Sequence, residues 1–227
     1  MKDQLAAGLQ GRAARATIRF MSHRPLILAS TSRYRQALLA RLSVPFSAVA
    51  PACDESLFRH LEPATQARTL ALRKAQALPP QAEDALIIGS DQVLELSGEV
   101  LHKPGTAAAA RAQLRALSGR QHRLLTAVAV YEPQSGRSEV DMDVHTLTMR
   151  DLSDAAIAAY VAVDQPLDCA GAYALERRGI ALFAHIAADP EGADDTAIIG
   201  LPLMKLCRLL RGFGYDVLEV GGAEPAG

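Results

Sequence analysis

The hydrophobic positions along the middle of the chain follow two alternating patterns. Short apolar runs bounded by turn residues predict strands, and apolar residues spaced three and four apart predict amphipathic helices. The predicted strands cover residues 26–29, 46–50, 86–96 and 180–186, with two longer strands, 122–131 and 137–149, joined as a hairpin. The predicted helices cover residues 33–42, 63–78, 107–117, 154–163 and 201–211.

Hydroxyl side chains and a proline mark the ends of these helices. Ser32, Thr106 and Ser153 each precede a helical pattern and can accept a hydrogen bond from its first turn. Pro63 suits the first turn of its helix, and Gly119 suits a helix stop. Strands that alternate with helices, together with one long hairpin, predict an α/β protein with a mixed sheet flanked by helices.

The two ends of the chain differ from this body. Residues 1–24 carry five basic side chains against one acid, without the apolar stretch of a secretory signal and with too little serine for a transit peptide. Met21 stands just before the first predicted strand and is an alternative natural start. We therefore expect residues 1–24 to be a disordered or mis-assigned extension, residues 25–216 to form the functional domain and residues 217–227 to form a tail.

Composition excludes several classes of protein. Hydrophobic residues make up 49% and charged residues 22%, which is ordinary for a globular protein and unlike a disordered or fibrous chain. The net charge of −1 gives no bulk attraction to nucleic acid, and the absence of Trp argues against a platform for stacking single strands. The apolar runs are too short to span a bilayer, so we expect no membrane association.

Three cysteines are too few and too scattered for a disulfide framework or a zinc site. They are Cys53, Cys169 and Cys207, and no two are close in sequence. We expect three reduced thiols, which fits a cytoplasmic protein.

Polar side chains follow the first two predicted strands, where loops converge at the edge of an open α/β sheet. Residues 30–35 combine three hydroxyl side chains with two arginines at the start of a helix, a combination that favours phosphate. Asp54 and Glu55 can bind a divalent cation through oxygen. The alternatives are an ordinary capped helix with solvated arginines and a solvated acidic turn.

Asp91 is the most informative position, because it interrupts the apolar run 86–94. A carboxylate there is costly unless it is paired, bound to metal or catalytic. Gly89 allows a ligand or another backbone to approach closely, and Lys74 and Lys103 can add charge that neutralises an oligophosphate. The alternatives are an exposed edge strand for Asp91 and ordinary surface positions for the two lysines.

Several catalytic motifs are missing from the sequence. It contains no Walker A pattern, GxGxxG, GxSxG or HExxH, and its six histidines are scattered. Carboxylates, lysines and arginines without a strong nucleophile indicate that water attacks phosphorus with the help of a metal ion.

Eight ordered motifs resemble those of the Maf family of nucleoside triphosphate pyrophosphatases, over about residues 26 to 214. They are the segments 26–35, 54–55, 73–75, 89–93, 103–104, 117–122, 170–173 and 199–203. The resemblance implies an elongated mixed sheet with a central cleft, as in Maf and ITPase-like folds. It also implies cleavage between the α and β phosphates as house-cleaning of modified nucleotides, with Mg²⁺ or Mn²⁺, in a cytoplasmic and often homodimeric enzyme. Segments 90–92 and 167–171 resemble the branch that acts on 7-methyl-GTP.

The resemblance also implies roles for individual residues. Asp91 matches the general base, and Glu55 and Asp91 match metal-binding positions. The positions around the triphosphate are Ser30, Arg35, Lys74 and Lys103, and those that set base preference are Tyr34, Gln92 and Glu176. The alternatives are the same reaction on dTTP, UTP or another non-canonical triphosphate, and a non-catalytic nucleotide-binding regulator of cell division.

The chemistry of 7-methylguanine suits two of these positions. Its ring is cationic, so Tyr34 can stack on it with a gain of about 0.5–2 kcal/mol. The carboxylate of Glu176 can accept hydrogen bonds from the N1–H and N2–H₂ groups. The chain departs from the family at Arg33, where proline is common, at His102, where glycine is common, and in an acidic segment at 189–196.

Overall fold

The computed structural model describes residues 24–77, 84–188 and 194–220. The seven-stranded sheet has the order β2-β1-β3-β5-β6-β7, and β4 pairs with β3 off this path. The strands are β1 (Leu26–Leu28), β2 (Phe46–Ala48), β3 (Leu86–Leu96), β4 (Glu99–Leu101), β5 (Gln121–Tyr131), β6 (Ser138–Met149) and β7 (Phe183–Ala188). β1 is parallel to β2 and β3, whereas the other pairs are antiparallel. The predicted mixed sheet is confirmed.

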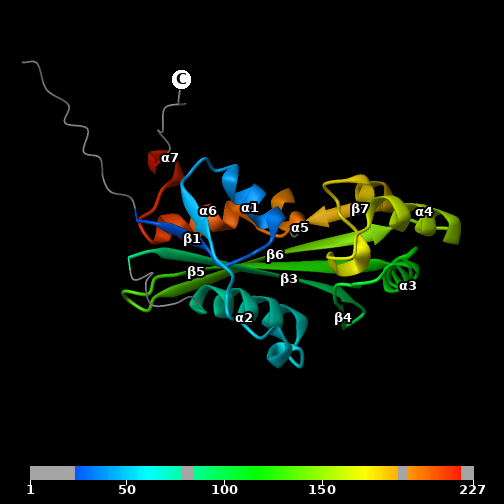
Figure 1. The fold of residues 1–227 in the computed structure, drawn as a ribbon, viewed down its shortest axis with the longest axis horizontal. Helices are drawn as coiled ribbons and strands as arrows, with labels where there is room; N and C mark the ends of the chain where they lie inside the picture. The colour runs from blue at the N-terminus through cyan, green and yellow to red at the C-terminus, as the bar shows by residue number, and fades with distance from the viewer. Residues whose placement is uncertain (1–23, 78–83, 189–193, 221–227) are drawn as a thin grey trace, which may run out of the picture.

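The long strands β3, β5 and β6 run along the length of the molecule, and helices cover both faces of the sheet (Figure 1). The α-helices are α1 (Arg33–Ala40), α2 (Pro63–Gln76), α3 (Ala107–Leu117), α4 (Asp154–Asp164), α5 (Asp195–Ile199), α6 (Leu203–Gly212) and α7 (Val217–Val220). The 3₁₀ turns are η1 (Glu55–Phe58), η3 (Ala170–Ala172) and η4 (Arg178–Leu182). The side chains of Ser32, Thr106 and Ser153 accept hydrogen bonds from the first turns of α1, α3 and α4, as predicted.

One face of the sheet packs against α2 at unusually short range. A Cβ atom at Gly89 of β3 would lie 2.1 Å from the Ala71 carbonyl oxygen and 2.7 Å from the Ala75 nitrogen. Only glycine therefore lets the alanine face of α2 meet the strand. This contact fixes the height of α2 above β3, and with it the position of Lys74, which α2 carries.

The opposite face is covered by α1 and α6, whose leucines form a core with β1, β3 and β5. Farther along the sheet, α3 and α4 build a second core around Leu114, Tyr160 and Tyr173. The cleft described below lies between these two cores.

Three local features differ from the predicted elements. β4 is a three-residue strand after a turn in which Ser97 and Gly98 both have positive φ, and its shortness hides any periodicity. Strand β7 begins at Phe183, because η4 occupies the first residues of the predicted strand. The helix expected from residue 201 begins at Leu203, and the five-residue helix α5 precedes it.

The predictions for the chain ends fall mostly outside the described residues, since these exclude residues 1–23 and 221–227. Within the predicted tail, α7 packs Val217 and Val220 against the first core. No helix in the described part of the chain has the length and apolar character needed to cross a bilayer.

Candidate active site

A buried lysine joins two carboxylates at the centre of the cleft. Lys74 of α2 places its Nζ 2.6 Å from Asp91 Oδ1 and 2.7 Å from Glu55 Oε1. Asp91 comes from the middle of β3, and Glu55 opens η1 directly after Asp54, whose side chain accepts a hydrogen bond from the backbone of Ser56. Three distant stretches of the chain therefore meet at one ammonium group.

The strand pairing leaves an open edge of the sheet beside Asp91. β1 pairs with β3 over Leu86–Ile88, and β4 pairs with β3 over Leu94–Leu96. Among the described strands, none pairs with residues 89–93 on that side, so this stretch of β3 borders the site. Asp91 is 6% exposed and lies on a central strand, so the alternative of an exposed edge strand is wrong.

The electrostatics of the two carboxylates differ. Burial raises the pKa of Asp91 above its ordinary value, although Lys74 and Arg35 act in the opposite direction. Burial also acts to raise the pKa of Glu55, but Lys74, Lys103 and Arg35 together lower it. The pKa values of the two carboxyl groups are thus shifted in opposite directions.

Arg35 and Ser30, which are predicted to contact phosphate, are held in place by neighbouring groups. Arg35 Nε donates to the carbonyl oxygen of Gly200 at 2.9 Å. Burial lowers the pKa of the Arg35 guanidinium, whereas Asp91 and Glu55 raise it. Ser30 is buried, and its Oγ accepts a hydrogen bond from the Ser32 backbone nitrogen at 3.1 Å.

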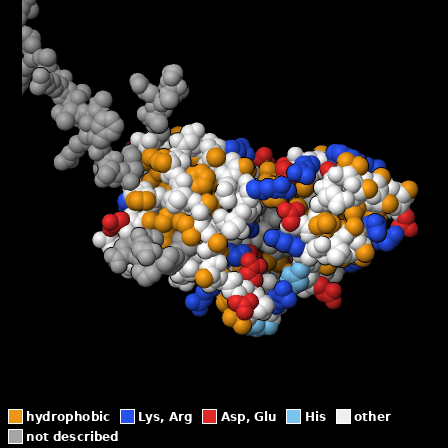
Figure 2. Space-filling model, in the orientation of Figure 1, with side chains coloured by type: hydrophobic (Ala, Val, Ile, Leu, Met, Phe, Trp, Pro, Cys, Tyr) orange, Lys and Arg blue, Asp and Glu red, His pale blue; other side chains and the backbone are white. Residues whose placement is uncertain are grey.

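These groups border two adjoining hollows. The first, with a volume of about 330 Å³, is lined by eight of the predicted residues: Tyr34, Arg35, Glu55, Lys74, Asp91, Gln92, Lys103 and Glu176. The second is about 610 Å³ and adds Ser30 to Arg35, Glu55, Lys74 and Lys103. Figure 2 shows basic and acidic side chains gathered around a hollow on this face. The structure therefore brings every predicted site residue to one cleft.

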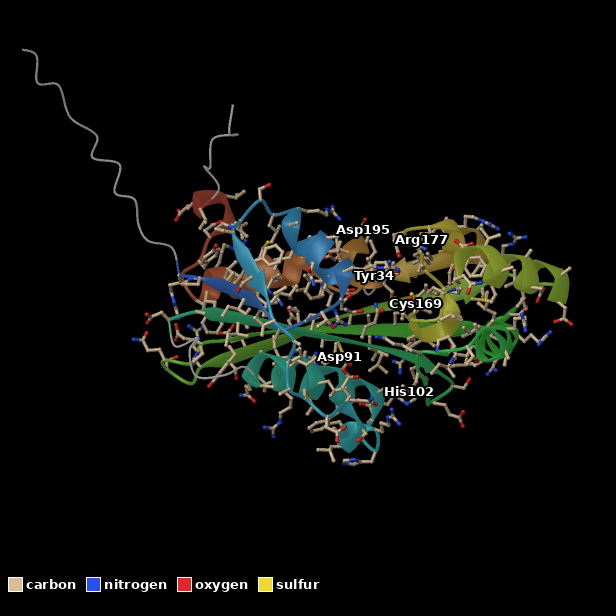
Figure 3. All side chains as sticks on the ribbon, in the orientation of Figure 1. Tyr34, Asp91, His102, Cys169, Arg177 and Asp195 are labelled. Atoms are coloured by element: carbon tan, nitrogen blue, oxygen red, sulfur yellow. The ribbon has the colours of Figure 1, made fainter. Side chains whose placement is uncertain are left out.

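Tyr34 and Gln92, two of the residues predicted to set base preference, have partners that the sequence did not predict. Arg33 lies over the ring of Tyr34, with its Cζ 4.8 Å from the centroid, and Arg33 Nη2 donates to Tyr34 Oη at 2.8 Å. Gln92 Nε2 lies within 3.0 Å of three oxygens, those of Thr126 Oγ1 and of the Ala197 and Ile198 carbonyls. Glu176 is exposed. Figure 3 shows Tyr34, Cys169 and His102 around the same central region as Asp91.

Two buried residues that contact the lining of the cleft were given no role from sequence. Ser90 Oγ donates to the carbonyl oxygens of Ala127 and Gly200, at 2.8 and 3.0 Å. His122 Nε2 lies 2.9 Å from Tyr173 Oη behind the cleft wall, and burial lowers the pKa of His122 to about 4. Ser90 belongs to the motif segment 89–93, but the sequence indicated no separate role for its side chain.

The site offers two carboxylates as ligands for a divalent cation. Within residues 24–77, 84–188 and 194–220, no group of three or more His, Cys, Asp or Glu side chains is arranged to hold a metal. Glu55 and Asp91 each place one carboxylate oxygen within 2.7 Å of the same ammonium group. Mg²⁺ is often held by one or two carboxylates together with substrate phosphates, and this donor set suits that mode.

An α/β cleft that combines two carboxylates with buried cations and a buried serine belongs to the class of sites that handle polyphosphates. A family model described as Maf-like protein matches residues 25–213. The chain belongs to the Maf family.

Curated relatives match most of the chain. A 7-methyl-GTP pyrophosphatase of Chromohalobacter salexigens is 45% identical over 193 residues, covering 85% of this chain and 98% of that protein. A protein of the same name from Albidiferax ferrireducens is 44% identical and covers 86% of this chain and 96% of its own. A dTTP/UTP pyrophosphatase of Moorella thermoacetica is 44% identical and covers 85% of this chain and 96% of its own.

Proposed function

We propose that this protein is a nucleoside triphosphate pyrophosphatase that hydrolyses 7-methyl-GTP to 7-methyl-GMP and pyrophosphate. The observation that carries the proposal is the ammonium of Lys74 held between Asp91 and Glu55 in a cleft that Arg35 and Lys103 also line. Curated relatives of the Maf family that bear this activity in their names support the substrate.

The reaction follows from the placement of the charges. Asp91 takes a proton from water, and the water oxygen forms a bond to the α phosphorus. The bond between that phosphorus and the α–β bridging oxygen breaks, and pyrophosphate leaves with the electron pair. Lys74, Lys103 and Arg35 bind the phosphate oxygens and stabilise the charge that develops on the leaving group, and Ser30 can donate a hydrogen bond to them.

We propose Mg²⁺ or Mn²⁺ as the cofactor, held by Glu55 and Asp91 together with phosphate oxygens. A divalent cation of this kind would neutralise charge on the triphosphate. The residues of the chain would still orient the substrate and receive the proton.

Base preference is assigned to Tyr34, Gln92 and Glu176. Glu176 is exposed at the cavity and can accept hydrogen bonds from the N1–H and N2–H₂ groups while offsetting the charge of the methylated ring. Glu176→Gln is expected to reduce the preference for 7-methyl-GTP over dTTP, because the amide has one acceptor and no charge. Competition between the two nucleotides measures this, and an unchanged preference would remove Glu176 from the role.

The same reaction on dTTP or UTP is the second candidate, favoured by the relative from Moorella thermoacetica whose name states that activity. A nucleotide-binding regulator of cell division is a third, without hydrolysis. The deciding assay measures pyrophosphate release from canonical and modified nucleoside triphosphates with Mg²⁺ or Mn²⁺. Release from 7-methyl-GTP in preference to dTTP, UTP and GTP is expected; preferential release from dTTP or UTP would change the substrate, and no release would indicate a regulator.

The remaining features of the proposal concern the setting of the enzyme. We propose a cytoplasmic homodimer whose partner is the nucleotide substrate rather than nucleic acid or membrane. The net charge of −1 and the three unpaired cysteines support this setting. Mass measurement by light scattering tests the dimer.

A further inference from the structure

The backbone of residues 197–200, at the end of α5, forms a wall that we call the α5 wall. Residues predicted to bind the base and residues predicted to bind phosphate both donate hydrogen bonds to its carbonyl oxygens. The carbonyl oxygens of Ala197 and Ile198 accept hydrogen bonds from Gln92 Nε2, at 3.0 and 2.9 Å. The carbonyl oxygen of Gly200 accepts from Arg35 Nε at 2.9 Å and from Ser90 Oγ at 3.0 Å. The position of this segment therefore decides where two predicted binding side chains lie.

The amide of Gln92 is oriented by these contacts. Backbone carbonyls can only accept hydrogen bonds, so the nitrogen of the amide must face α5 and its oxygen must face elsewhere. Gln92 lines the cavity, and Oε1 is the acceptor that its amide can offer to an N–H group of a base. A shift of α5 would release Gln92 Nε2 from these carbonyls, and the amide would then no longer be fixed in the orientation that favours a base with an N–H group.

The wall needs an external support because α5 has only five residues. A helix this short does not hold its own position, since isolated short helices are unstable in water. The support comes from Asp194, which is 3% exposed at the N-terminus of α5. Its Oδ1 accepts from the backbone nitrogen and the hydroxyl of Thr196, and its Oδ2 accepts from the Met204 nitrogen at 2.7 Å.

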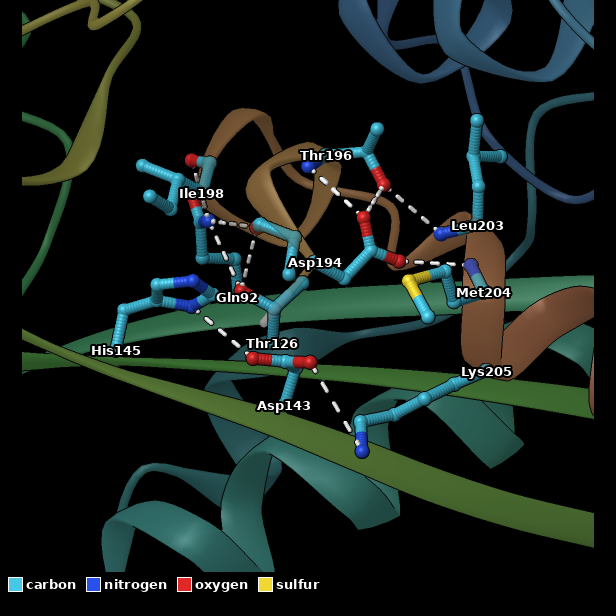
Figure 4. Close-up of polar contacts among 11 residues, drawn as sticks. Gln92, Thr126, Asp143, His145, Asp194, Thr196, Ile198, Leu203, Met204 and Lys205 are labelled. Atoms are coloured by element: carbon cyan, nitrogen blue, oxygen red, sulfur yellow. Dashed lines mark hydrogen bonds and ion pairs between the residues drawn. The ribbon is translucent and has the colours of Figure 1, made fainter. Parts of the chain in front are cut away.

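Asp194 thereby caps two helices with one carboxylate (Figure 4). Helix α6 has Pro202 as its N-cap, which provides no side-chain hydrogen bond. Its first N–H groups are satisfied from the start of α5 instead: Met204 by Asp194, and Leu203 by Thr196 Oγ1 at 2.9 Å. The bridge ties α5 to a ten-residue helix packed in the first core.

We propose that Asp194 is a positioning residue that sets nucleotide affinity and base preference through the α5 wall. Asp194 does not line either hollow, so it acts through the carbonyls that hold Gln92 and Arg35. The inference rests on the proposed function for the identity of the nucleotide. The ion pairs that join Lys74 to Asp91 and Glu55 involve no residue of the wall, so the chemical step should be affected less than nucleotide binding.

The test is Asp194→Asn in the full-length protein. The Asn oxygen can still cap α5, but the amide nitrogen cannot accept the hydrogen bond from Met204, so the bridge to α6 breaks. We expect KM for 7-methyl-GTP to rise about tenfold, because Gln92 and Arg35 lose the carbonyls that position them, and kcat to fall by a smaller factor, because Arg35 also stabilises the leaving group. The preference for 7-methyl-GTP over dTTP should fall as well.

The chain offers a matched control one residue away. Asp195 is exposed, so Asp195→Asn removes the same charge without breaking the bridge and should leave KM and preference unchanged. A second pair uses Thr196, whose hydroxyl also joins the two helices. Thr196→Val should reproduce the effect of Asp194→Asn. Thr196→Ser keeps the hydroxyl and should therefore retain the wild-type KM and preference.

Binding measurements separate failure of this inference from failure of the proposed function. The Kd of an α,β-methylene analogue of 7-methyl-GTP is measured by calorimetry for each variant, beside thermal unfolding. Weaker binding in Asp194→Asn and Thr196→Val, but not in Asp195→Asn, supports the inference even when no hydrolysis is found in the wild type. A lower Tm with unchanged Kd and unchanged preference would reduce Asp194 to a structural cap, and a wild type that binds no nucleotide would overturn both proposals.

Discussion

The ion pair between Lys74 and Asp91 makes a prediction about stability that can be checked without any substrate. Both residues are almost completely buried, at 7% and 6% exposure, and their charged atoms are 2.6 Å apart. Lys74→Met keeps an unbranched side chain of similar length and removes only the ammonium. The change leaves the carboxylate of Asp91 in a buried site without its cation.

The expected cost is large at alkaline pH. Breaking one partner out of a buried ion pair costs about 3–5 kcal/mol, because an uncompensated charge remains. Glu55 contributes little to this cost, since 57% of its side chain is exposed and it can be hydrated. The free energy of unfolding of Lys74→Met should therefore be about 3–5 kcal/mol lower than that of the wild type at about pH 8.

The cost should shrink at acid pH. Burial already raises the pKa of Asp91, and removal of Lys74 deletes the leading influence that lowers it, so the pKa rises further. A carboxyl whose folded pKa lies above its unfolded pKa stabilises the protein below the unfolded value and loses that contribution as pH rises through the folded value. Lys74→Met should thus lose less stability at about pH 5, where Asp91 can take up a proton on folding.

Urea unfolding followed by circular dichroism, with EDTA present, measures these free energies at both pH values. The double variant Lys74→Met with Asp91→Asn should recover most of the loss, because neither charge remains. Lys103→Met removes an exposed lysine from the same cleft and should change stability by less than about 0.5 kcal/mol. An equal loss at both pH values, or a double variant no more stable than Lys74→Met, would refute the reasoning.

Two further predictions concern the rim of the cleft and the contact beneath it. Arg33→Ala frees the ring face of Tyr34 and removes a cation that lies beside the cationic base. The ratio of kcat/KM for 7-methyl-GTP over GTP should therefore rise about two- to fivefold. An unchanged ratio would show that the base does not stack on this ring. Gly89→Ala forces a Cβ into the backbone of α2 at Ala71 and Ala75, so the free energy of unfolding should fall by more than about 2 kcal/mol in urea titrations. Wild-type stability in Gly89→Ala would contradict the close contact between α2 and β3.

Physical reasoning from the sequence could identify a site residue where burying its polar side chain would cost free energy unless the side chain had a partner or a function. Asp91 interrupts a buried strand, so burial reasoning singled it out, and Ser32 is a strong cap signal before a helical pattern. Lys74 falls near the end of a helix, where a solvated position is ordinary. Only the three-dimensional structure shows that it is buried between two acids.

The wall formed by α5 could not be predicted, because its working groups are backbone carbonyls. Any residue provides a carbonyl, so the side chains of Ala197, Ile198 and Gly200 do not indicate this role, although Gly200 lies in the motif segment 199–203. Helix α5 is too short for a helical period to appear, and the same holds for the three residues of β4. The placement of Arg33 over Tyr34 depends on side-chain conformation at an exposed surface, which local propensity does not determine.

Hydrolysis of 7-methyl-GTP in water enriched in ¹⁸O tests the central claim most directly, because it reports which phosphorus the water attacks. Attack at the α phosphorus, with Asp91 as the base, predicts that the label appears in 7-methyl-GMP and that pyrophosphate stays unlabelled. It also predicts that Asp91→Asn slows the labelled product by about a hundredfold or more. Label in pyrophosphate or in orthophosphate, or near-normal turnover by Asp91→Asn, would contradict the account.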